Sequence, residues 1–171
     1  MRLTFSHSDY MNTDISDEQG RLLYRINTPF AWKNQKTTVT KYAEKTQQPE
    51  ELAVIEWKWL KNPVIHFKGN TVAADDLLTT RSWSSGRYFK GPDGRMYKWK
   101  IQTTNCWLKL EDSDLVLAKY HDRNFGIRKS SHPPYLEISS SVTHMLDELI
   151  TTFIYAEKLS LDAQASASAA A

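Results

Sequence analysis

The stretch RYFKGPDGRMYKWKI, residues 87–101, decides how this chain folds. Proline presets φ for a turn and glycine tolerates positive φ, so GPDG at residues 91–94 predicts a tight reversal between two extended segments. After the turn the residues alternate, which places Tyr97, Trp99 and Ile101 on one face. The opposite face would carry Met96, Lys98 and Lys100. The stretch therefore predicts an antiparallel hairpin with one face in the core and the other in water.

Similar short segments recur on both sides of this hairpin. They are rich in β-branched and aromatic residues and are separated by turn residues, a spacing typical of all-β sandwiches and barrels. Residues 112–114 predict a second hairpin. The predicted strands are residues 22–27, 37–42, 52–59, 64–68, 87–90, 95–101, 106–111, 115–121 and 135–139, with an earlier strand at 3–5.

The period of the sequence changes after Ser139. Apolar residues then recur at intervals of three and four, which predicts an amphipathic helix over about residues 142–158. The remaining surface of this helix tolerates burial, so its second half could be enclosed on nearly all sides. We expect a single mainly β (α+β) domain over residues 1–160, with a sheet wrapped around the helix. A low-complexity tail follows at 161–171.

Composition excludes several classes of protein. The chain has 171 residues, 20 aromatics and one cysteine, so it is neither a disulfide scaffold nor a zinc ribbon, and most of it is not disordered. A net charge of +2 is too small to predict nucleic-acid binding. No signal-like apolar run opens the chain and no stretch reaches bilayer-spanning length, so we expect a cytoplasmic protein without a transmembrane segment.

Several motifs in a fixed order resemble a known group of proteins. They are LTF (3–5), GRLLYRI with TPF (20–30), LAVIEW (52–57), GPDGRMYKWK (91–100) and LDELITTFIY (146–155). This order is similar to that of short fungal proteins, abundant in mushroom-forming basidiomycetes, that form a family of unknown function. The resemblance covers roughly residues 3–158.

That family resembles the tubby C-terminal, LURP-one-related and phospholipid scramblase group. The resemblance implies a closed antiparallel β-barrel that encloses a hydrophobic C-terminal helix. Tubby domains bind phosphoinositide headgroups through basic residues, to which Lys98 and Lys100 are a loose parallel. The chain lacks the cysteine-rich segment associated with scramblases, and the resemblance implies no catalytic residue.

Basic residues gather around the first hairpin. Residues 81–100 hold six cations and one acid, a local net charge of +5. Such a cluster could hold phosphates or an anionic membrane surface, to which each charge contributes about 1 kcal/mol. Alternatively, the lysines only solvate the hairpin and prevent edge pairing. The candidate anion- or lipid-binding residues are Arg87, Lys90, Arg95, Lys98 and Lys100, and Arg81 lies nearby.

No motif predicts a metal, a cofactor or a catalytic centre. His144 and Glu148 are one helical turn apart, but the five histidines are otherwise scattered. Cys106 is expected to be a buried structural thiol. His121 next to Asp122 is half of an acid/base pair with no marked nucleophile. The chain has neither a glycine-rich phosphate loop nor a nucleophile elbow.

The aromatic residues and one loop remain to be assigned. Trp57 and Trp59 would share a strand face, and we expect most tryptophans to fill a core rather than to stack on ligands. Residues 124–134 predict a long loop suited to a partner contact. We therefore expect a non-enzymatic domain that binds an anionic phospholipid or a protein. The alternative is a small-ligand carrier or an enzyme whose site, around His121 or His66, is assembled from distant residues.

Overall fold

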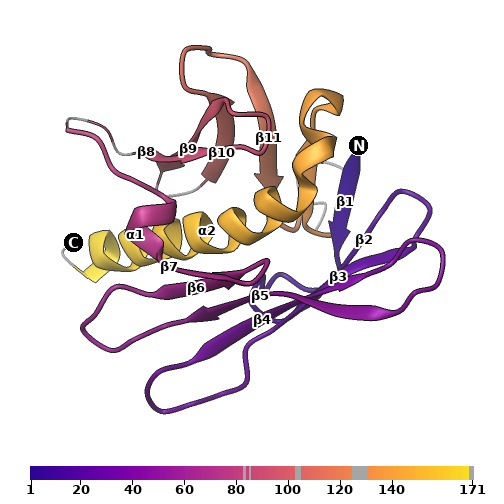
Figure 1. Cartoon of the computed structure of the whole chain (residues 1–171), viewed down its shortest axis with the longest axis horizontal. Coiled ribbons are helices and arrows are strands. Elements are labelled where there is room, and N and C mark those ends of the chain that lie inside the picture. The colour runs from indigo at the N-terminus through magenta and orange to yellow at the C-terminus, as the bar shows by residue number, and fades with distance from the viewer. Residues whose placement is uncertain (83, 85, 103–104, 125–130, 170–171) are drawn as a thin grey trace. The chain divides into compact units, whose positions relative to one another are not determined.

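The computed structural model divides the chain into two compact units (Figure 1). It describes residues 1–82, 84, 86–102, 105–124 and 131–169. The first unit comprises residues 1–74 and 121–137. The second unit comprises residues 75–120 and 138–171.

The first unit is an antiparallel sheet in the strand order β7-β6-β5-β4-β3-β2-β1-β12. Its first and last strands do not pair in the part of the chain that is described, so this sheet is not closed into a barrel. Its strands are β1 (Arg2–Phe5), β2 (Thr13–Ser16), β3 (Leu22–Asn27), β4 (Lys36–Tyr42), β5 (Pro49–Glu56), β6 (Val64–Phe67), β7 (Asn70–Ala73) and β12 (Tyr135–Ile138). Leu3, Phe5 and Ile15 are fully buried, as the alternation of apolar residues requires.

The second unit combines four strands with the C-terminal helix. Its sheet has the order β11-β10-β9-β8, also antiparallel, and its edge strands do not pair within the described residues. The strands are β8 (Gly86–Lys90), β9 (Met96–Gln102), β10 (Asn105–Leu110) and β11 (Val116–His121). The helices are the short α1 (Ala74–Leu77), the 3-10 helix η1 (Ser140–Met145) and α2 (Leu146–Ala169).

Helix α2 packs against β9 and β10. Every residue from Leu149 through Glu157 is buried, so this part of the helix is enclosed on all sides, as its sequence predicts. The Trp99 indole N–H donates to Thr152 Oγ1 at 2.9 Å. The Thr152 hydroxyl itself donates to the Glu148 carbonyl at 2.8 Å, so these buried polar groups are satisfied. Ser139 caps the preceding 3-10 helix.

Both predicted hairpins and the predicted helix are confirmed. Gly91 and Arg95 close the first turn, Gly94 adopts the positive φ of +80° that the turn requires, and Tyr97 and Trp99 are fully buried. The helix extends beyond residue 158, because the Ala- and Ser-rich segment expected as a tail continues α2 in exposed turns to Ala169. The fold is mainly β and antiparallel with a C-terminal helix.

Four elements differ from the prediction. Strands β2 and β7 and the short helix α1 were not among the predicted elements. Strand β5 ends at Glu56, so the prediction that Trp57 and Trp59 share a strand face is wrong. The N–H of Trp57 still donates to the carbonyl of Gln35, just before β4, but Leu60 has a φ of +59°, which an extended strand does not accommodate.

The first hairpin turn yields a stability prediction. A Cβ on Gly91 would lie 2.6 Å from Tyr97 Cε2 and 2.8 Å from Asp93 Oδ1. The Tyr97 ring is fully buried against Phe89, so it cannot move away. We expect Gly91→Ala to lower the free energy of unfolding by about 1–3 kcal/mol, as overpacking does. Urea denaturation measures this loss, and a change below about 0.5 kcal/mol would contradict the packing described.

Candidate functional site

One face of the second unit's sheet is rich in lysine. In an antiparallel pair, directly opposite residues share a face. Lys98 lies opposite Tyr88 and Lys109, while Lys100 lies opposite Trp107, which in turn lies opposite Lys119. Because the alternate residues Tyr97 and Trp99 are buried on the helix side, these lysines occupy the other side. We call this surface the lysine face; it consists of Lys90, Lys98, Lys100, Lys109 and Lys119.

Aromatic rings and two carboxylates organise the lysine face. The Lys98 amino group lies 5.2 Å from the Tyr88 ring centroid, and that of Lys100 lies 5.5 Å from the Trp107 ring. Asp114 Oδ1 is 3.0 Å from Lys109 Nζ, and this contact, with the charges of Lys100 and Lys98, lowers the pKa of Asp114. Glu111 pairs with Arg81. Basic residues therefore outnumber acidic ones on this face.

The five predicted anion-binding residues are not brought together. Lys90, Lys98 and Lys100 share the lysine face, whereas Arg95 belongs to the turn and binds Asp93 at 2.8 Å. Arg87 lies opposite Trp99, which places it on the helix side of the sheet. Lys109 and Lys119 were missed, although the same alternation in the second hairpin indicates their side.

Two loops of the first unit expose large hydrophobic side chains. They are residues 28–35, between β3 and β4, and residues 57–63, between β5 and β6; we call them the aromatic loops. Phe30 is 87% exposed, Trp32 86%, Trp59 65% and Leu60 91%. The expectation that tryptophans mainly fill the core therefore fails for Trp32 and Trp59. Trp99 does lie in the core, and Trp83 lies outside the described residues.

The aromatic loops lie side by side at one end of the β4–β5 pair. Lys36, which begins β4, lies opposite Glu56, which ends β5. The N–H of Trp59 donates to Asn34 Oδ1 at 3.2 Å and thereby joins the loops. Lys33, Lys58 and Lys61 belong to the loops, which contain no carboxylate. At their base, Glu56 contacts Lys36 at 2.6 Å and Lys58 at 3.7 Å.

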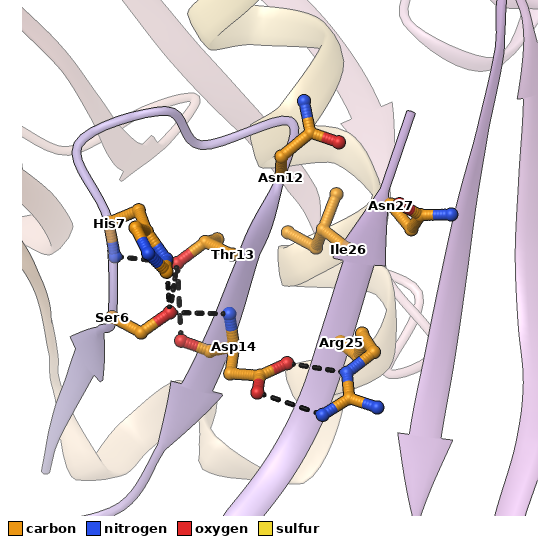
Figure 2. Close-up of a pocket in the computed structure, with 8 residues that line it drawn as sticks. All are labelled: Ser6, His7, Asn12, Thr13, Asp14, Arg25, Ile26 and Asn27. Atoms are coloured by element: carbon orange, nitrogen blue, oxygen red, sulfur yellow. Dashed lines mark hydrogen bonds and ion pairs between the residues drawn. The ribbon is translucent and has the colours of Figure 1, made fainter. Parts of the chain in front are cut away.

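A polar pocket of about 250 Å³ also lies in the first unit (Figure 2). Ser6 Oγ is 2.8 Å from His7 Nδ1 and accepts the N–H of Asp14 at 2.9 Å. Arg25 donates to both carboxylate oxygens of Asp14, at 2.7 and 2.9 Å. The remaining lining residues are Asn12, Thr13, Ile26 and Asn27.

The charge pair in this pocket limits what the serine and histidine can do. The hydrogen bond from Arg25 is the largest cause of the lowered pKa of Asp14. The same contact raises the pKa of Arg25. With both Asp14 oxygens occupied by Arg25, the carboxylate does not orient His7 as a Ser-His-Asp triad requires. The pocket offers hydrogen bonds to a polar ligand rather than an activated nucleophile.

The other candidate residues are placed as follows. Cys106 is buried, and its thiol donates to Glu157 Oε2 at 3.0 Å; burial first and the Glu157 charge second raise its pKa well above normal. His144 faces Asp93 at 3.5 Å, and no metal-binding cluster occurs among the described residues.

The predicted partner loop, residues 124–134, lies largely outside the described residues, because 125–130 are not among them. No helix in the described ranges is long and apolar enough to cross a membrane.

Comparison with known proteins identifies the family. No curated protein and no solved structure matches the chain. The model of the family of unknown function DUF6593 matches residues 8–162, nearly the whole of both units. The chain therefore belongs to this family of unknown function.

Proposed function

We propose that this protein is a binding domain that docks reversibly on an anionic membrane surface through its aromatic loops. The observation that supports the proposal is the exposure of Phe30, Trp32, Trp59 and Leu60 on two adjoining loops that carry lysines. Isolated exposed hydrophobic residues are ordinary, but a contiguous group marks an interaction surface. Tryptophan and lysine together suit the boundary between headgroups and acyl chains.

The composition of the loops favours an anionic lipid surface. Each lysine near such a surface contributes about 1 kcal/mol. Full burial of a large apolar side chain contributes about 1.5–3 kcal/mol, which is an upper limit at an interface. Lys36 and Lys58 share Glu56, so Lys33 and Lys61 supply most of the charge. Binding is therefore expected to be reversible and to weaken with salt.

Vesicle binding tests the proposal. Vesicles of phosphatidylcholine with about 30% phosphatidylserine should bind the full chain, because they carry a negative surface charge. Vesicles of phosphatidylcholine alone should bind it more weakly. We expect the variant Trp32→Ser/Trp59→Ser to bind at least about tenfold more weakly, a loss of about 1.4 kcal/mol. Leu115→Ser is the matched control, because Leu115 is 64% exposed outside the aromatic loops. An unchanged affinity of the loop variant, or no binding by the parent, would contradict the proposal.

The lysine face supports a second candidate function. Five lysines on one side of a sheet, two of them held near aromatic rings, suit a multiply charged phosphate headgroup. Lys98→Glu/Lys100→Glu should then abolish binding to phosphoinositide vesicles, whereas Lys41→Glu/Lys45→Glu, with the same change in charge, should retain it. If both pairs behave alike, only the net charge of the chain matters and this candidate fails.

The wider classification is also a proposal. Antiparallel strands and a buried C-terminal helix support a distant relationship to the tubby-like group, although the sheet is not closed into a barrel in the described residues. A non-enzymatic role in the cytoplasm fits the docking proposal. The carrier or enzyme alternative would use the polar pocket around Ser6 and His7 or residues near His121 or His66.

A further inference from the structure

A second cavity lies in the second unit, at the side of the sheet that faces α2. Its volume is about 320 Å³, and it is lined by Thr80, Ser84, Gly86, Arg87, Ile101 and Leu159. Arg87 reaches this side because the hairpin register places it opposite the buried Trp99. Leu159 comes from α2. The next residue of the helix, Ser160, donates a hydrogen bond to the Gln102 carbonyl. Strands β8 and β9 and helix α2 thus all contribute to the cavity.

Arg87 is the positively charged side chain that lines this cavity. It is half-buried, and its guanidinium makes no hydrogen bond or ion pair with the residues that the structure describes. The other two arginines of the hairpin region differ, because Arg81 pairs with Glu111 and Arg95 with Asp93. A partly buried charge is stabilised by a paired anion, and a guanidinium suits the geometry of a carboxylate or phosphate. Arg87 is therefore available to an anion.

The carboxylate of Asp75, which like Arg87 acts on Tyr155, does not take that role. Asp75 Oδ1 accepts the hydroxyl of Tyr155 at 3.2 Å. Burial and the charge of Asp75 raise the pKa of Tyr155 to about 12, and the charge of Arg87 opposes this rise. Asp75 therefore bonds Tyr155 and makes no ion pair with Arg87.

The cavity has a polar end and an apolar wall. The hydroxyls of Thr80 and Ser84 lie with Arg87, and Ser84 Oγ is fixed by the N–H of Gly86 at 3.1 Å and by the hydroxyl of Tyr88 at 3.0 Å. Ile101 and Leu159 provide the apolar wall. Ligand cavities commonly combine apolar walls with a few fixed polar groups, and this volume is at the small end of their range.

We propose that this cavity binds a small aliphatic anion, a carboxylate or phosphate group on a short alkyl chain. The charged group pairs with Arg87 and accepts hydrogen bonds from Thr80 and Ser84, and the alkyl chain lies against Ile101 and Leu159. The site does not depend on the docking proposal, because it contains no residue of the aromatic loops.

Calorimetry on the full chain tests this site with octanoate and octyl phosphate, both below their micelle concentrations. At least one should bind, and the stronger binder identifies the headgroup. Octanol should bind at least about tenfold more weakly than either anion that binds. We expect Arg87→Gln to weaken binding at least about tenfold and Arg87→Lys to retain part of it, because lysine keeps the charge but not the fork of donors. Equal binding of octanol, or unchanged affinity in Arg87→Gln, would overturn the proposal, as would failure of both anions to bind.

Further variants separate the possible reasons for a loss of binding. Leu159→Trp fills the apolar end while leaving Arg87 in place, so it should also abolish binding and serves if Arg87→Gln does not fold. Arg95→Gln, which removes a cation from the turn, should bind like the parent. Trp32→Ser/Trp59→Ser should also bind octanoate or octyl phosphate normally. Loss of binding in that loop variant would overturn the separate site without deciding whether the loops dock on membranes.

Discussion

Replacing Phe153 with alanine is expected to lower the free energy of unfolding by about 3–5 kcal/mol. The Phe153 side chain is fully buried on α2. Its ring centroid lies 5.2 Å from that of Tyr120 and 6.0 Å from that of Trp99. Removing the ring leaves a cavity between large, rigid aromatics that collapse poorly, so the loss should lie in the upper part of the range found for large-to-small substitutions.

Chemical denaturation of the full chain measures this loss. The matched control is Leu161→Ala, eight residues further along the same helix, because Leu161 is 41% exposed and its truncation opens no cavity. The control should change the free energy of unfolding by no more than about 0.5 kcal/mol. Equal effects of the two substitutions would show that α2 is not enclosed at Phe153.

The hairpins and the helix were predictable because their signals are local. A GPDG turn, alternation on both sides of it and an apolar period of three and four each refer to neighbouring residues. Strand β1 pairs with β12, which is far from it in the sequence. Neither segment contains a sequence signal that indicates which strand it pairs with. Strand β2, TDIS, is short and has a single apolar residue, so periodicity alone does not distinguish it from a loop.

The aromatic loops show how alternation misleads. The sequence VIEWKW continues the period of two past Glu56, so it resembles a longer strand. The chain leaves the sheet there because Leu60 adopts a φ of +59°, which an extended strand does not accommodate. Trp57 remains half-buried and its indole N–H donates to Thr37, whereas Trp59, which an extended strand would place on the same face, is exposed to solvent. The sequence signal for an exposed loop was the alternation of lysines with tryptophans in residues 57–61, followed by Pro63.

The side of the sheet on which Arg87 lies depends on the length of the first turn, which the sequence alone does not fix. A four-residue turn at 91–94 would pair Lys90 with Arg95 and Arg87 with Lys98. The observed register instead pairs Lys90 with Met96 and places Arg87 opposite Trp99. The sequence therefore grouped Arg87 with Lys98 and Lys100, whereas the register places it on the other side of the sheet.

Raising the pH from 10 to 12 is expected to remove about 4 kcal/mol of stability through two buried tyrosines. Burial, followed by the hydrogen bond to Asp93, raises the pKa of Tyr97 to about 12. Burial and the Asp75 charge raise the pKa of Tyr155 to about 12. Both phenols start from an ordinary pKa of 10. Each therefore loses about 2 kcal/mol of stability between pH 10 and pH 12.

The sign of this pH dependence follows from whether the folded or the unfolded chain holds the phenolic protons. Above pH 10 the unfolded chain releases both phenolic protons while the folded chain keeps them, so stability falls as the pH rises and this contribution is lost by about pH 12. Below pH 10 both states hold the protons and the contribution is constant. Urea denaturation at pH 9, 10, 11 and 12 measures the slope, which Tyr97→Phe/Tyr155→Phe should flatten relative to the parent. Since phenylalanine keeps the rings and removes only the titrating groups, an equally steep slope in that variant would show that other groups drive the alkaline loss.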